Sequence, residues 1–113
     1  MVRLWARGIR CTPGEPECMQ ILAICRRRTE SFTPEQFAAL LDDEAEGVRS
    51  LYAQGVVRAA WTREDVLGAC LLLEAEHVEA AAAAMSSLPL VSRGMLETQF
   101  IPMRGYRGFG PRV

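Results

Sequence analysis

The sequence contains no lysine and no asparagine, and all thirteen of its basic residues are arginine. Without lysine, the chain has no side chain that could form a Schiff base or act as an amine general base. The net charge is only −1 at pH 7, so no overall field attracts a nucleic acid or an anionic membrane. The acids are concentrated in residues 31–80, and both ends are arginine-rich. The middle and the ends are therefore expected to meet across an oligomer.

Cysteine and histidine are too few and too scattered for a metal site. The four cysteines form no C-x-x-C pair, and the chain has a single histidine, His77. The spacings between these cysteine and histidine residues match no zinc-binding pattern. We therefore predict no metal and no cofactor, place His77 at the solvated end of a helix, and expect all four cysteines to be free thiols: Cys11, Cys18, Cys25 and Cys70.

Long apolar runs are also missing. No stretch reaches the roughly 18 apolar residues of a membrane-spanning helix, and arginines interrupt the first ten residues, where a signal peptide would need an apolar segment. These features predict a cytoplasmic protein with no membrane partner.

What is present suits one small domain. The chain has 113 residues, half of them hydrophobic, which is enough for one core. Residues 1–17 contain a Pro/Gly-rich stretch without periodicity and are expected to form an irregular arm. The domain is expected over 18–109 and a short tail over 110–113. Either Met19 is the true start and the residues before it are an extension, or those residues form a genuine ordered arm.

Periodicity predicts six elements. A proline and capping residues predict a helix from Thr33 to Gly55, and an alanine-rich run predicts a second helix. The expected strands are 19–26, 56–61, 66–74 and 95–101, and the second helix covers 76–87. This order predicts an α+β, ferredoxin-like β-α-β-β-α-β fold with a four-stranded antiparallel sheet. Because two helices cover only one sheet face, we expect a homodimer or a higher homo-oligomer.

Glu44 is the sharpest candidate for chemistry. At helical spacing it lies on the same arc as several apolar residues, including Leu40, Leu41, Val48 and Leu51. Burial raises the pKa of a carboxyl group and suits it to removing and returning a proton. We therefore interpret Glu44 as a catalytic base. The alternatives are a position at the edge of the apolar stripe or a structural pair with an arginine.

Arg58, Trp61 and Tyr52 are the candidate substrate-binding residues. Arg58 could hold a substrate carboxylate or compensate Glu44, and the two aromatic side chains could line a pocket or belong to the core. Regular alternation would place Arg58 with Val56 and Ala60, and Trp61 with Val57 and Ala59. Glu44 and Arg58 would then lie on different sides of the sheet.

Residues 37–61 resemble a segment of the muconolactone isomerase family, with Glu44, Gly55, Arg58 and Trp61 at matching positions without a gap. The run Met85-Ser86-Ser87-Leu88-Pro89-Leu90 is similar to the end of that family's second helix, and the resemblance extends over about residues 19–109. It implies a dimeric α+β barrel and movement of a double bond in an unsaturated lactone. One departure is that the family's first helix is lysine-rich around its glutamate, whereas this chain contains no lysine.

Two functional hypotheses follow. The first is a cofactor-independent isomerase or related proton-transfer enzyme acting on a small unsaturated cyclic metabolite, such as a muconolactone-like lactone, with Glu44 as base. The second is a non-catalytic dimeric module that binds a small molecule or assists a partner enzyme. A small monooxygenase of the antibiotic-biosynthesis type is a further alternative from the same superfamily. Its heme-degrading relatives typically use an asparagine, which this chain lacks.

Overall fold

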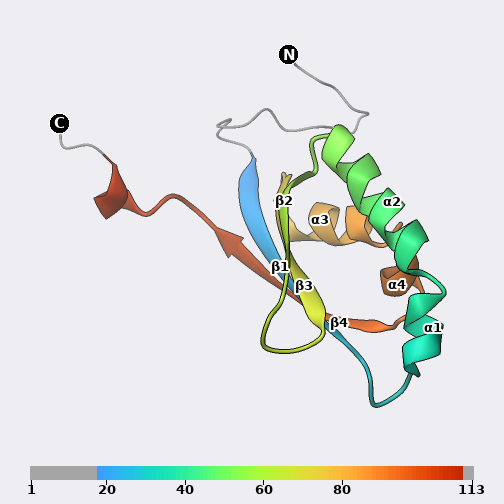
Figure 1. Ribbon diagram of the computed structural model, residues 1–113. Coiled ribbons are helices and arrows are strands. Elements are labelled where there is room, and N and C mark those ends of the chain that lie inside the picture. Colours follow the sequence, from blue (N-terminus) through green and yellow to red (C-terminus); the bar gives the residue numbers. More distant parts are fainter. Residues whose placement is uncertain (1–17, 111–113) are drawn as a thin grey trace.

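The computed structural model describes residues 18–110, and the predicted arm over 1–17 lies outside them. The elements are β1 (Met19–Arg27), α1 (Pro34–Ala38), α2 (Leu41–Ala53), β2 (Val57–Thr62), β3 (Gly68–Ala75), α3 (Val78–Met85), α4 (Pro89–Ser92), β4 (Leu96–Met103) and a 3₁₀ turn, η1 (Arg107–Phe109) (Figure 1). The predicted α+β fold of ferredoxin-like order is confirmed.

The four strands form one antiparallel sheet in the order β2-β3-β1-β4. β1 lies between two partners, so that Ile24 pairs with Cys70 of β3 and with Gln99 of β4. The first strand of residues 18–110, β1, is therefore paired with the last one, β4.

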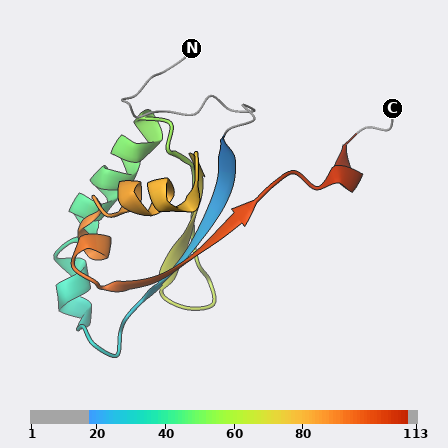
Figure 2. The same cartoon turned by 180° about the vertical axis from the view of Figure 1, so that it is seen from behind.

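One face of the sheet carries the core. Alternate residues of β1, namely Ile21, Ala23 and Cys25, are almost fully buried, as are Leu71 and Leu73 of β3. The helices lie on this side of the sheet (Figures 1 and 2), and the apolar faces of α2 and α3 complete the cluster. Successive strand residues point to opposite faces, so the other face is formed by half-buried side chains that no described helix covers: Leu22, Ile24, Cys70, Leu72 and Ile101. We refer to these five residues as the uncovered face.

The helix expected to run from Thr33 to Gly55 is divided in two. Thr33 caps α1 as predicted, with its hydroxyl accepting from the Gln36 N–H and the Gln36 side chain accepting from the Thr33 N–H. Leu40 (φ −113°, ψ −1°) then separates α1 from α2. The two segments have different anchors, since Phe37 of α1 is buried in a second cluster with Leu90 and Met95.

The alternation expected over 56–61 is wrong, because β2 contains a bulge. The register with β3 shifts between Val57 and Ala59, which leaves Arg58 as the additional residue. Ala60 now pairs with Leu71 and shares the helix-covered face, whereas Trp61 pairs with Cys70 of the uncovered face. A short helix, α4, was also not expected from the sequence.

The described cysteines differ in state. Cys25 and Cys70 are free thiols, in agreement with the prediction for them. Cys18 is disulfide-bonded, so the prediction of a free thiol is wrong at that position.

After β4 the chain leaves the body of the protein. The segment from Arg104 to the 3₁₀ turn η1 projects away from the sheet (Figures 1 and 2). It carries Tyr106 and Phe109, which are 79% and 87% exposed. Over residues 18–110, no helix has the length and apolar character needed to cross a bilayer.

Candidate functional site

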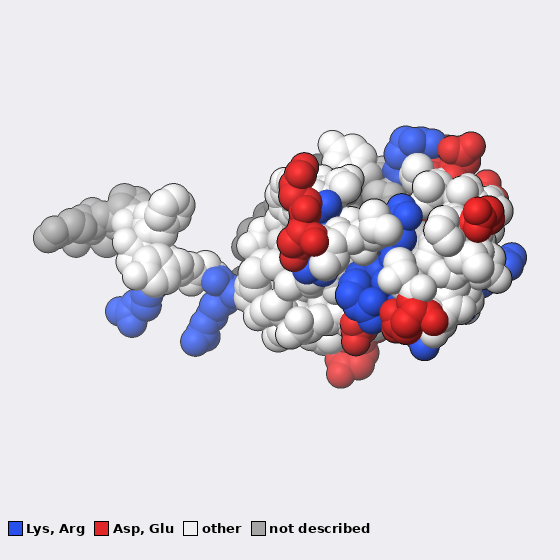
Figure 3. Space-filling model, turned by 60° about the horizontal axis from the view of Figure 1, so that its bottom comes forward, with Lys and Arg blue, Asp and Glu red and all other residues white. Residues whose placement is uncertain are grey.

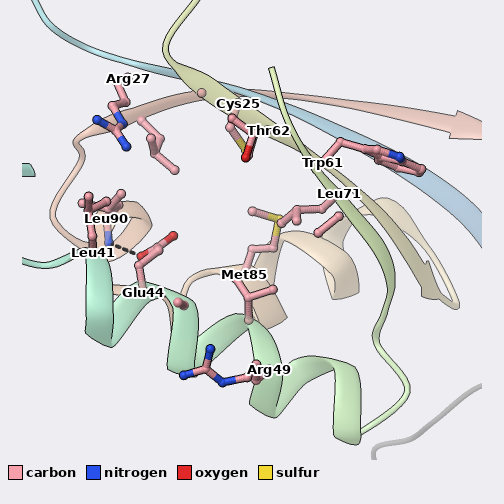
Figure 4. A pocket seen from close by; sticks show the side chains of 16 residues that line it. Cys25, Arg27, Leu41, Glu44, Arg49, Trp61, Thr62, Leu71, Met85 and Leu90 are labelled. Atoms are coloured by element: carbon pink, nitrogen blue, oxygen red, sulfur yellow. Dashed lines mark hydrogen bonds between the residues drawn. The ribbon is translucent and has the colours of Figure 1, made fainter. Parts of the chain in front are cut away.

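A cavity of about 450 Å³ lies between α2 and the helix-covered face of the sheet (Figure 4). Its walls come from α2, all four strands, α3 and α4. Most of the lining side chains are apolar: Leu41, Ala45, Val48, Ala60, Trp61, Ala69, Leu71, Met85, Leu90 and Leu96. An apolar cavity of this size with a few polar groups is typical of a small-molecule site.

Glu44 is the acidic residue of this cavity. It is half-buried on α2, and its carboxylate projects from the helix toward the sheet (Figure 4). The backbone N–H of Leu90 donates to Oε1 at 2.8 Å. Leu88, the N-cap of α4, provides no side-chain cap of its own, so Glu44 satisfies an N–H of that helix from outside. No described residue donates a hydrogen bond to the second carboxylate oxygen.

The surroundings of Glu44 change its acidity. Burial raises the pKa of the carboxyl group above its usual value, and the hydrogen bond from Leu90 partly opposes this. The proton is therefore held more tightly than on an exposed glutamate. A carboxyl group of this kind is suited to accept a proton from a weakly acidic C–H and return it.

Cys25 also lines the cavity, opposite Glu44 on β1. Burial raises the pKa of its thiol, and the hydrogen bond of 3.6 Å from the Thr98 hydroxyl to Sγ has a smaller opposing effect. The thiol thus remains protonated near neutral pH and is a poor nucleophile. It contributes an almost apolar surface to the wall.

Arg27 was not identified from the sequence. It is the last residue of β1 and lies on the same face as Ile21, Ala23 and Cys25, at the edge of the cavity (Figure 4). Its guanidinium carbon is 5.3 Å from the centre of the Phe37 ring, within the range of a cation–π contact. The strand itself continues to position 27, so the alternation of faces along β1 places Arg27 on the side of Cys25.

The structure brings only some of the predicted site residues together. Trp61 borders the cavity, but the residue is 53% exposed and its indole points away from Glu44 (Figure 4). Tyr52 is 63% exposed and is not part of the lining. Arg58 is also outside the lining; its Nε is 3.9 Å from Oε1 of Glu74, a buried carboxylate without a hydrogen bond to that oxygen. Arg58 therefore does not compensate Glu44.

Charges near the edge of the site are mostly paired. Figure 3 shows the end of the molecule with the β1–α1 and β2–β3 connections, where basic and acidic side chains lie next to each other. Arg26 contacts both Glu30 and Glu97, and Arg63 contacts Asp65. These arginines lower the pKa of Glu30 and of Asp65 to about 2.

Residues 18–110 contain no group of three or more His, Cys, Asp or Glu side chains placed to hold a metal ion. His77 lies at an exposed helix end as predicted, and its Nδ1 accepts from the Ala80 N–H at 3.1 Å.

Comparison with known proteins gives no matching family model and no matching curated sequence. The functional argument consequently rests on the cavity and its side chains.

Proposed function

We propose that this protein is a cofactor-independent isomerase, or a related proton-transfer enzyme, acting on a small unsaturated cyclic metabolite such as a muconolactone-like lactone. The observation that carries the proposal is the Glu44 carboxylate beside an apolar cavity: one oxygen accepts from the Leu90 N–H, and the other accepts no hydrogen bond from residues 18–110. The resemblance of residues 37–61 to muconolactone isomerases supports the same role for Glu44.

In the proposed reaction, Glu44 removes a proton from the saturated ring carbon that is conjugated with the lactone carbonyl group through the existing double bond. The C–H electron pair forms a new double bond as the existing one shifts, and the same carboxyl group returns the proton to another ring carbon. No other reactant is consumed. The raised pKa of Glu44 favours this cycle, because the group must be both a base and an acid near the working pH. The Leu90 N–H holds the carboxylate in one orientation.

A second candidate is a non-catalytic module that binds a small molecule in the same cavity. It is favoured by the hydrogen bond from Leu90, because capping α4 is a structural reason for a carboxylate at position 44. The two functions share the ligand site and differ in proton transfer.

The first prediction separates them through Glu44→Gln. The amide oxygen still accepts from Leu90, so we expect the free energy of unfolding to stay the same or increase, while the general base is lost. Deuterium exchange from solvent into muconolactone, followed by NMR, should fall at least about 100-fold. Glu46→Gln is the matched control, since Glu46 is exposed on the same helix and pairs with Arg49.

Exchange that survives in Glu44→Gln would contradict the catalytic role. Binding of the lactone by the unsubstituted protein without any exchange would favour the binding module instead.

We also infer that the functional unit is a homodimer that buries the uncovered face. Its apolar side chains are only half-buried in one subunit, and an apolar sheet face of a small domain is generally stabilised by a second layer. The occupant we assign is a second copy, because the projecting segment offers Tyr106 and Phe109 beyond the body of its own subunit (Figure 2).

A further inference from the structure

We propose that Arg27 binds the carboxylate of the ligand, so that the cavity selects an apolar ring bearing one negative charge. This inference rests on the proposed function in placing the ligand beside Glu44. It adds the chemical class of that ligand and the residue that recognises it.

Arg27 differs from the other arginines around the site in having no carboxylate partner. Arg26 lies 3.1 Å from Glu30 and 2.8 Å from Glu97, Arg63 lies 2.7 Å from Asp65, and Arg49 lies 2.7 Å from Glu46. Within residues 18–110, Arg27 forms neither an ion pair nor a side-chain hydrogen bond, and its guanidinium lies over the Phe37 ring. Its N–H donors are consequently free to bind a ligand.

The place of this charge supports a ligand role. Arg27 is half-buried as a residue at the edge of the cavity, and an ion pair formed in partly desolvated surroundings is stronger than one at a fully exposed arginine. A planar guanidinium can donate two parallel hydrogen bonds to one carboxylate. The Phe37 ring supports the group from one side and limits its freedom.

Glu44 and Arg27 mark the positions at which the two ends of a bound ligand would lie. They extend from opposite walls, helix and sheet, toward the same part of the cavity (Figure 4), and no ion pair joins them. A ligand with its carboxylate on Arg27 would place its ring among apolar side chains and a ring C–H near Glu44. A second negative charge on the ring would face the Glu44 carboxylate and be disfavoured.

Arg49 provides a matched comparison. It borders the same cavity, but it is paired with Glu46 and its guanidinium points away from the cavity interior (Figure 4). Loss of the Arg49 charge should therefore leave ligand choice unchanged.

The second prediction uses two inert ring compounds, furan-2-acetate and its neutral amide, titrated into the full-length protein by calorimetry. We expect the unsubstituted protein to bind the acetate about tenfold more tightly than the amide, the size of one charge-assisted contact. Arg27→Gln should reduce this preference to less than about twofold, and Arg49→Gln should retain it. Arg27→Met, which keeps an apolar contact with Phe37, should behave like Arg27→Gln and serves where that variant does not fold.

The inference is overturned if the acetate is not preferred, if neither probe binds, or if a folded Arg27 variant keeps the preference. Because these titrations need no turnover, they are independent of proton transfer. Carboxylate selection by Arg27 in a protein without exchange activity would disprove catalysis and retain this inference. Conversely, deuterium exchange could require Glu44 and be unaffected by Arg27→Gln, with no preference for the acetate. That result would support the catalytic role of Glu44 and disprove carboxylate binding by Arg27.

Discussion

Glu44 experiences two opposing effects. Partial burial disfavours its charged form, whereas the Leu90 N–H favours it, and the first effect is larger because the pKa is raised overall. A carboxyl group kept only as a helix cap would gain from a lower pKa, since the charged form accepts the stronger hydrogen bond. The capping hydrogen bond alone would lower the pKa, so the raised value reflects the burial of the carboxyl group beside the cavity.

The third prediction is a pH dependence of stability caused by this group. The folded pKa lies above the usual value of 4.5, so folded protein retains a proton that the unfolded chain has released. The contribution of Glu44 to stability is complete below the unfolded pKa and is lost as the pH rises through the folded pKa. Urea unfolding across this range should show the loss in the unsubstituted protein and not in Glu44→Gln.

Glu30 and Asp65 have lowered pKa values and oppose this trend, but they are present in both proteins and cancel in the difference. Equal pH profiles for the two proteins would show that position 44 does not titrate abnormally.

Individual site residues were predictable where a single element determines their position. Helical spacing was sufficient to find Glu44, because its place among apolar residues depends on α2 alone. Arg58 could not be placed in this way, since the bulge that displaces it depends on pairing with β3. Arg27 was recoverable from the alternation of β1, but only with knowledge of which face the helices cover.

At the scale of elements, β1 and β3 approach each other closely at Gly68. Gly68 begins β3 and lines the cavity. A Cβ atom placed on Gly68 would lie 2.0 Å from the Cys25 carbonyl oxygen and 3.0 Å from its carbonyl carbon. The obstacle is backbone of the central strand, which cannot rotate away as a side chain can.

The fourth prediction is that Gly68→Ala destabilises the protein by at least about 2 kcal/mol, because the two strands must separate locally. Chemical denaturation measures the change. Gly105→Ala is the control, since a Cβ there meets nothing within 4 Å, and its effect should stay within about 0.5 kcal/mol. Equal stability of the two variants would show that β1 and β3 can separate at this point without cost.

Helix boundaries illustrate what local sequence leaves out. The capping residues around Thr33 correctly predicted where the first helical segment begins. No glycine or proline marks the break between α1 and α2 near Leu40 in the sequence. It follows from the burial of Phe37 against Leu90 and Met95, which are more than fifty positions away in the chain. The same distant cluster explains why α4 forms just after Leu88.

At the scale of the whole molecule, the β-α-β-β-α-β order was predictable because each strand and helix has its own periodicity. The antiparallel sheet then follows from general rules of chain connection. What those rules leave open is the partner of the uncovered face, since no helix within residues 18–110 covers it.

The fifth prediction concerns that partner. We expect the protein to sediment as a dimer at micromolar concentration and Leu72→Arg to sediment as a monomer, because Leu72 pairs with Leu22 in the middle of the uncovered face and a charge there opposes burial. Ala83→Arg is the control, since Ala83 is exposed on α3, and it should remain dimeric. A folded, stable monomer of the unsubstituted protein would exclude the proposed dimer.

The central position of β1 has a consequence for how the protein is made. Among the strands of residues 18–110, β1 leaves the ribosome before the others, yet one of its two neighbours is β4, in which Met103 pairs with Gln20. Until β4 has emerged, one edge of β1 has free backbone groups that another nascent chain could bind. Synthesis that pauses before residue 96 should therefore increase the yield of aggregated protein, and chaperone capture of the growing chain should persist until the last strand has emerged.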